Sequence, residues 1–236
     1  MPSKELQQQM YGLTGKSTAQ RATLASLLGL WLILIYWLLL GGGIPVVASW
    51  IGWDWHSLNS ARCAVLTAAF SIYFVRLLFT IFTFLRRGMS WQEVFTIGPW
   101  VLFIFLLIGI AGALNSTPLG ISAVAGCIFF LVGSWMNSWA EYSRHVWKRR
   151  PENKGRLYTE GLFRVTRHPN YLGDLLSFSG LCLFSGLWFT WIVPILMFVL
   201  FTFVNIPVLD AHLHEHYGKQ FEIYAGRTAK LIPFLY

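Results

Sequence analysis

Six long apolar stretches constrain this chain more than any other feature of its sequence. Most of them are close to the roughly 20 residues that an α-helix needs to cross the hydrocarbon core of a bilayer. Hydrophobic residues make up 56% of the chain and charged residues only 12%, against about 25% charged in globular domains. The sequence therefore predicts an all-α, polytopic membrane bundle of six transmembrane helices, with a candidate seventh. The expected spans are Ala22–Leu40, Ala61–Leu85, Val94–Leu114, Leu119–Trp139, Leu175–Trp188 and Phe189–Pro207.

The distribution of Lys and Arg predicts the orientation of these spans. The loops Gly41–Ser60 and Asn115–Pro118 contain neither residue, whereas the alternate loops and the segments outside the first and last spans are basic. Cytoplasmic loops carry the excess of positive charge in membrane proteins. Both termini are therefore expected in the cytoplasm, and the net charge of +8 is explained without a nucleic-acid partner.

Two parts of the topology are less regular. The spans on either side of Gly186 are short and are expected to form a tight helical hairpin. The segment Gly41–Trp55 is a candidate re-entrant or interfacial half-helix, because its tryptophans suit the membrane interface. We expect a single membrane domain, 1–236, whose first span stays as an anchor.

The cysteines and histidines give no metal signature. Cys63, Cys127 and Cys182 occur singly inside apolar stretches, so packed, reduced thiols are expected rather than a zinc site or a disulfide framework. His212 and His216 lie four residues apart, but no third ligand has matching spacing. No metal is therefore predicted.

The stretch "RHPNYLGD" (Arg167–Asp174) is the densest group of functional side chains. The proline biases the preceding His168 away from helix, which predicts an ordered turn leading into a helix. Asn170, Tyr171 and Asp174 then fall on the first helical turn, where free backbone N–H groups gather. Asp174 could simply be a helix-start acid, but the whole group favours a ligand site.

A basic segment, Arg144–Arg167, precedes this turn and holds eight Lys and Arg residues against two acids. Attraction to anionic lipid headgroups would explain it. Guanidinium groups also bind phosphates bidentately, so the segment suits a phosphorylated dinucleotide better than the cationic S-adenosylmethionine. No G-x-G-x-x-G follows a strand, which argues against a Rossmann site. The carboxy-terminal segment is expected to fold back over the basic segment as a lid.

Polar side chains inside the apolar helices are further candidates, because they are costly in lipid. Arg76 lies in the middle of the second span, with Tyr73 three residues earlier on the same face. A polar stripe ends the fourth span at spacings of four, three and four residues if the helix continues past the membrane. Its members are Asn137, Glu141, Arg144 and Lys148.

The segment "RPENKGRLYTEGLFRVTRHPNYLGD" resembles the signature of the steroid 5-alpha-reductase-like membrane family. Its "RHPNYLGDLL" portion is also similar to sterol reductases, as is the ending "DAHLHEHYGKQFEIYAGRTAKLIPFLY". The resemblance covers residues 135–236, with a fainter match around Tyr73. It implies an all-helical NADPH-dependent membrane reductase that transfers a hydride to a carbon–carbon double bond of a steroid, sterol or similar lipid.

The resemblance also assigns roles to individual positions. It implies that Tyr73 hydrogen-bonds a substrate carbonyl, and from its place on the same helical face we expect Arg76 to tune Tyr73 in catalysis. The positions matching the family's cofactor contacts are Asn137, Glu141, Arg156, Arg167, His168, Asn170, Tyr171 and Asp174, with His212 and Tyr217 near its carboxy-terminal contacts. A departure is that the earlier spans lack the glutamate that partners this tyrosine in 5-alpha-reductases, and Asp54 is the only acid nearby.

Two other functions remain open on the sequence. The core "RHP-x-Y-x-G" also occurs in isoprenylcysteine and phospholipid methyltransferases that use S-adenosylmethionine, and a non-enzymatic lipid-binding or scaffold role is a third candidate. The full sequence of the motif from Asn170 to Asp174 and the excess of cations in the basic segment favour the reductase. The expected partners are membrane lipids and a hydrophobic substrate from the bilayer, the expected oligomeric state is a monomer or weak homo-oligomer, and no nucleic acid is expected.

Overall fold

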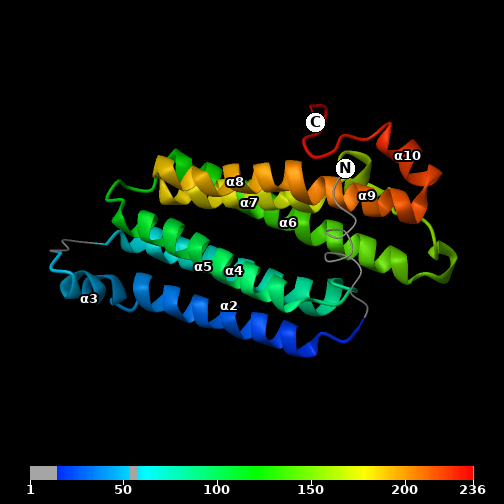
Figure 1. The fold of residues 1–236 in the computed structure, drawn as a ribbon. Coiled ribbons are helices and arrows are strands. Elements are labelled where there is room, and N and C mark those ends of the chain that lie inside the picture. The colour runs from blue at the N-terminus through cyan, green and yellow to red at the C-terminus, as the bar shows by residue number, and fades with distance from the viewer. Residues whose placement is uncertain (1–14, 54–57, 236) are drawn as a thin grey trace.

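The computed structural model describes residues 15–53 and 58–235 of the chain, and these residues form a helical bundle (Figure 1). They contain no strand, only one isolated bridge between Thr166 and Ala229. The predicted all-α class is thus confirmed. The α-helices are α2 (Thr18–Leu39), α3 (Gly43–Trp50), α4 (Ser60–Phe79), α5 (Trp91–Leu114), α6 (Ile121–Arg149), α7 (Pro169–Ser185), α8 (Ile192–Leu200), α9 (Ile206–Tyr217) and α10 (Lys219–Ala225).

Short helical segments of other types extend or join these helices. Two π-helical segments, η1 (Thr80–Phe84) and η5 (Phe201–Asn205), continue α4 and join α8 to α9. The 3-10 segments are η2 (Pro151–Asn153), η3 (Gly161–Arg164) and η4 (Trp188–Trp191).

Five continuous helical segments are long and apolar enough to cross a membrane, so the chain is an integral membrane protein. These are Thr18–Leu39, Ser60–Phe84, Trp91–Leu114, Ile121–Arg149 and Trp188–Tyr217. The expected count of six is not confirmed, because the helix α7 at the predicted fifth span has only 17 residues. Gly186 ends α7 in the left-handed conformation at φ +70°, and η4 and α8 then return along it, which agrees with the predicted hairpin.

Two helices are longer than the sequence predicted. α6 does not end at Trp139 but continues to Arg149, as the polar stripe requires. The last long helix passes through Pro207 and ends at Tyr217. Proline lacks the N–H that an interior helical position needs, and the wider turn of η5 directly before α9 accommodates that loss.

The interface between α6 and α7 is the closest helix contact of the bundle. Gly126 and Gly133 on α6 face Gly180 and Gly173 on α7. A methyl group added to Gly133 would lie 2.4 Å from the carbonyl oxygen of Gly173, and one added to Gly180 would lie 2.6 Å from that of Gly126. Small residues permit such close approach of membrane helices. The contact brings the half of α6 that ends at Arg149 beside the start of α7, where Asn137 donates to the carbonyl oxygen of Asn170.

At the opposite end of the bundle, buried Arg62 ties α4 to the end of α7. Its guanidinium donates to the carbonyl oxygen of Phe184, and Nη2 donates to that of Thr117 at 2.7 Å. The amide of Asn115 donates to the carbonyl oxygen of Ser185 at 2.9 Å. The bonds to Phe184 and Ser185 satisfy carbonyl groups that the end of α7 leaves without intrahelical partners. This role of Arg62 was not predicted from the sequence.

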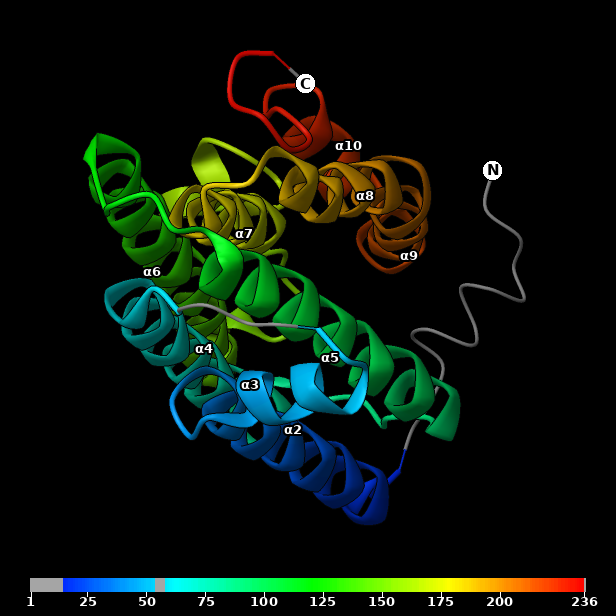
Figure 2. The same ribbon diagram turned by 90° about the vertical axis from the view of Figure 1, so that its left-hand side faces the viewer.

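The view along the bundle shows α2, α4 and α5 on one side and α7, α8 and α9 on the other, with α6 flanking α4 and α7 (Figure 2). The main apolar core lies mostly among α2, α4, α5 and α7. The short helix α3 presents an exposed Trp50, which fits the predicted interfacial half-helix, while Asp54 and Trp55 lie outside the described residues. Cys63 and Cys182 are packed, but Cys127 is exposed on the outer side of α6, so the expectation of packing was wrong there.

We predict that Gly133→Ala destabilises the protein by about 1–3 kcal/mol, because the added methyl group has no space between α6 and α7. Gly29→Ala on α2 is the matched control, since its methyl group would meet only Phe74 at an ordinary 3.8 Å. Thermal unfolding in detergent would compare the two. Equal melting temperatures for the two variants would contradict the close contact.

Candidate functional site

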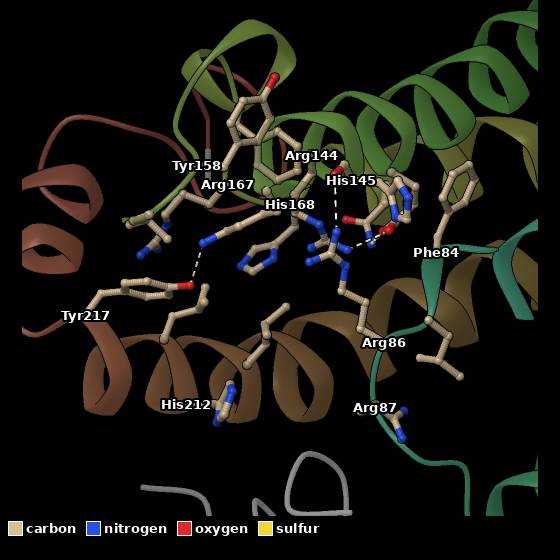
Figure 3. A pocket seen from close by; sticks show the side chains of 18 of the residues that line it. Phe84, Arg86, Arg87, Arg144, His145, Tyr158, Arg167, His168, His212 and Tyr217 are labelled. Carbon is tan, nitrogen blue, oxygen red and sulfur yellow. Dashed lines mark hydrogen bonds and ion pairs between the residues drawn. The ribbon is translucent and has the colours of Figure 1, made fainter. Parts of the chain in front are cut away.

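A cavity of about 480 Å³ lies at the end of the bundle where α6 leaves the core and α7 begins (Figure 3). Its walls come from η1 and the following loop, from α6, from the segment before α7 and the first turn of α7, and from α9 and α10. The lining residues are Thr80, Phe84, Leu85, Arg86, Arg87, Glu141, Arg144, His145, Lys148, Leu157, Tyr158, Phe163, Arg167, His168, Asn170, Leu209, His212, Leu213, Tyr217 and Tyr224.

The cavity gathers most of the side chains that the sequence singled out for a cofactor. Eight of the twelve line it: Glu141, Arg144, Lys148, Arg167, His168, Asn170, His212 and Tyr217. Asn137, Arg156, Tyr171 and Asp174 are not among the lining residues. Members of the polar stripe on α6 and of the stretch "RHPNYLGD" are distant in the sequence, yet they line the same cavity.

The turn before α7 has the predicted form. Pro169 is the first residue of α7, and His168 precedes it in a non-helical conformation with φ −126° and ψ 59°. Proline suits this first position because the N–H it lacks would have no intrahelical partner there. The helix thus begins well before the apolar run at Leu175, which places Asn170 at the cavity wall.

A chain of hydrogen bonds joins α6 to this turn. The amide of Asn137 donates to the carbonyl oxygen of Asn170 at 3.0 Å. The amide of Asn170 donates in turn to Oε1 of Glu141 at 3.2 Å, and Oε2 of Glu141 accepts from Arg144 at 2.5 Å. Asn137 therefore supports Asn170 from behind, while Glu141 and Arg144 face the cavity.

The pair Arg167 and His168 is held by Asp210 on α9. Nη1 of Arg167 lies 3.2 Å from one carboxylate oxygen, and Nε2 of His168 lies 3.0 Å from the other. Burial of the imidazole lowers the pKa of His168 below its ordinary value, and the Asp210 carboxylate opposes this only in part. His168 is therefore neutral near pH 7.

The far wall of the cavity joins α6 to the end of α9. The ammonium group of Lys148 donates to the phenol oxygen of Tyr217 at 2.8 Å and also to the carbonyl oxygen of Arg156. Figure 3 shows Tyr217 at one end of the cavity and Arg86, Arg144 and His145 together at the other, with His168 between these ends.

The carboxy-terminal segment folds over the basic segment, in agreement with the predicted lid. The phenol of Tyr224 donates to the carbonyl oxygen of Phe163 at 2.7 Å. The hydroxyl of Thr166 donates to the carbonyl oxygen of Leu231 at 2.9 Å, and the backbone N–H of Arg167 donates to that of Ala229 at 2.8 Å. These bonds fix the cavity wall around Arg167.

The remaining predicted residues lie deeper in the bundle. Arg76 on α4 pairs with Asp174 on α7 at 2.7 Å, and its guanidinium lies 4.8 Å from the ring centre of Tyr73. Asp174 therefore belongs with Tyr73 and Arg76 rather than with the cavity-lining residues. Tyr171 stacks between His168 and Phe201. Neither Tyr73 nor Arg76 lines the 480 Å³ cavity.

Sequence reasoning missed several lining residues and one that acts behind them. Arg86 and Arg87 served only to orient the spans, although they follow the helix of Tyr73 directly. His145 and Tyr158 carried no distinguishing signal. Asp210 was not predicted as a site residue, yet it contacts two motif residues, Arg167 and His168. In the described part of the chain, no group of three His, Cys, Asp or Glu side chains could hold a metal ion.

The fold and the cavity define a helical integral membrane protein with a cationic site at one end. A family model described as "Protein of unknown function (DUF1295)" matches residues 88–228. The chain belongs to this steroid 5-alpha-reductase-like family.

Individual relatives carry different activities in their names. 3-Oxo-5-alpha-steroid 4-dehydrogenase 2 of Rattus norvegicus is 26% identical over 193 residues, covering 79% of this chain and 74% of the rat protein. Delta(14)-sterol reductase of Arabidopsis thaliana is 33% identical over 97 residues, covering 35% and 26%. Probable O-methyltransferase ustE of Ustilaginoidea virens is 42% identical over 89 residues, and the match spans 37% of this chain and about a third, 31%, of that protein.

We predict that the folded state loses stability as the pH falls below about 6.5, the ordinary pKa of histidine. The pKa of His168 is lowered in the folded state, so there the unfolded chain binds a proton that the folded protein does not. The glutamine of His168→Gln cannot titrate. The melting temperature of this variant should therefore fall less than that of the wild type between pH 8 and pH 5, which is about 1.5 units below that pKa. Identical losses in the two proteins would show that His168 is not held neutral by burial.

Proposed function

We propose that the protein is an NADPH-dependent membrane reductase that adds a hydride and a proton across a carbon–carbon double bond of a steroid, sterol or similar lipid. The observation that carries the proposal is the charge of the cavity. Five Lys and Arg side chains line it against the single carboxylate of Glu141. Even when the paired acids behind the wall, Glu93 and Asp210, are included, the cations remain in excess.

This charge suits the phosphates of a dinucleotide, and the donor set fits them. Arg144 and Arg167 offer guanidinium groups, and Lys148 offers an ammonium group, all of which bind phosphate oxygens well. Nε of Arg167 is buried without a hydrogen-bond acceptor among the described residues. A buried donor without an acceptor is rare in folded proteins, and it agrees with an acceptor supplied by a bound ligand.

In this proposal the chain positions both reactants while bound NADPH supplies the hydride. Asn170, Glu141 and Tyr217 orient the cofactor beside the cations, and Asn137, Arg156 and Tyr171 support them from behind. Tyr73 donates the proton from its phenol oxygen or polarises a substrate carbonyl. Arg76, fixed by Asp174, stands over the Tyr73 ring, so Asp174 is the acid of this chain that lies near the tyrosine.

The membrane placement proposed here has the cavity on the cytoplasmic side, both termini in the cytoplasm and α7 as a sixth crossing. The cations Arg86, Arg87 and those of Arg144–Arg167 all lie at the cavity end. The cytoplasm supplies the cofactor to that end, while the lipid substrate enters from the bilayer.

A second candidate is a methyltransferase that uses S-adenosylmethionine. The 42% identity to the probable O-methyltransferase over 89 residues favours it. The excess of cations in the cavity disfavours it, because the sulfonium of S-adenosylmethionine is itself positive.

We predict that NADPH raises the melting temperature of the detergent-purified protein and that S-adenosylmethionine does not. A ligand at 100 times its Kd adds about 2.7 kcal/mol to the free energy of unfolding. Lys148→Gln should reduce the NADPH shift, because it removes a cation from the cavity, while Lys154→Gln in the exposed loop should leave it intact. A shift with S-adenosylmethionine alone would replace the reductase by the methyltransferase.

We further predict that Tyr73→Phe lowers the rate of lipid reduction about 100-fold or more, the usual contribution of a general acid, while leaving the NADPH thermal shift unchanged. The substrates would be a 3-oxo-Δ4-steroid and a Δ14-sterol in mixed micelles, with NADPH oxidation and product mass as readouts. Tyr36→Phe on the exposed face of α2 is the control. Full turnover in Tyr73→Phe would remove Tyr73 from the reaction.

A further inference from the structure

Asp210 on α9 is a carboxylate that serves two cavity residues at once. Its Oδ2 lies 3.2 Å from Nη1 of Arg167, and its Oδ1 lies 3.0 Å from Nε2 of His168. Asp210 is not itself among the residues that line the cavity. It therefore reaches Arg167 and His168 from behind the wall that they form.

The contact with Asp210 determines which nitrogen of His168 carries the proton. A carboxylate only accepts hydrogen bonds. Nε2 of His168 must therefore be the donor. The ring is 1% exposed, so it is neutral, and a neutral imidazole protonated at Nε2 leaves Nδ1 as an acceptor.

The same carboxylate orients Arg167. Only Nη1 takes part in the ion pair with Asp210, and the side chain is 6% exposed. Nε is buried and has no acceptor in the part of the chain that the structure describes. The guanidinium is thus held in place while part of its donor capacity is left for another molecule.

We propose that Asp210 is a positioning residue that sets Arg167 as a donor and His168 as an acceptor on one wall of the cavity. A ligand that matches this pair has an anionic oxygen beside a hydroxyl group, as a phosphorylated ribose does. The inference rests on the proposed function and deepens it, because it assigns the ribose–phosphate part of the cofactor to this wall. Asp210 touches neither cofactor nor substrate.

The effect of removing the Asp210 charge separates positioning from simple electrostatics. If Asp210 acted only as a negative charge near a phosphate, Asp210→Asn would strengthen NADPH binding. If it positions Arg167 and His168, Asp210→Asn weakens binding, because one of the two oxygens that accept from these side chains becomes an NH2 group, which only donates. We expect a loss of about tenfold, the size expected from one hydrogen bond to a charged group.

The binding experiment compares wild type, Asp210→Asn and Asp210→Glu in detergent by titration with NADPH. Asp210→Glu keeps the charge and the acceptors, so it should recover part of the affinity. Glu222→Gln is the matched control, since Glu222 pairs with His214 at 2.9 Å but both side chains are exposed and lie outside the cavity. Equal or tighter binding by folded Asp210→Asn overturns the proposal.

A second measurement does not depend on NADPH or on the folding of an Asp210 variant. Nitrogen-15 spectra of histidine-labelled wild type, with His168→Gln to identify the signal, report which ring nitrogen is protonated. The proposal requires a proton on Nε2 alone, and a proton on Nδ1 alone overturns it. If the wild type has the Nε2 proton but binds no NADPH, the result would support the arrangement around Asp210 and contradict the proposal that NADPH is the cofactor.

Discussion

The close contact between α6 and α7 is the constraint on which the rest of this structure depends. Paired glycines, Gly126 with Gly180 and Gly133 with Gly173, let the two backbones meet with no side chain between them. In a membrane, where burial of apolar area gives helices little reason to associate, such close packing is a principal source of attraction. It also fixes the register that sets Asn137 against Asn170.

Around the first turns of α7, polar groups from three other helices are satisfied by one another. Arg76 of α4 meets Asp174, Glu141 of α6 meets Asn170, and Asp210 of α9 meets His168. Charges in a spanning segment are tolerated where they face protein and find partners. The start of α7 is therefore the place where charged side chains of three other helices meet. It also forms part of the cavity wall, through His168 and Asn170. This arrangement explains why chemical side chains concentrate in "RHPNYLGD".

What the sequence could predict was set by interactions local in the chain. Apolar length located the helices, proline placed the turn at His168, and helical spacing brought Glu141 and Lys148 to one cavity. It could not locate Asp210, whose partner His168 is 42 residues away on a different helix, because spacing carries no information about which helices pack together. The excess of Lys and Arg expected in cytoplasmic loops was a sufficient explanation for Arg86. Its position in the cavity was therefore not predicted.

The hydrogen bonds between residues 229–231 and Thr166–Arg167 have a consequence for biosynthesis. The glycine-packed pair α6 and α7 can form as soon as both helices have left the ribosome, before residues 229–231 have done so. The wall around Arg167 cannot, since part of its backbone bonding comes from segments that emerge later. Insertion and assembly of the cavity are thus separate events in time, and a ligand can engage only the second of them.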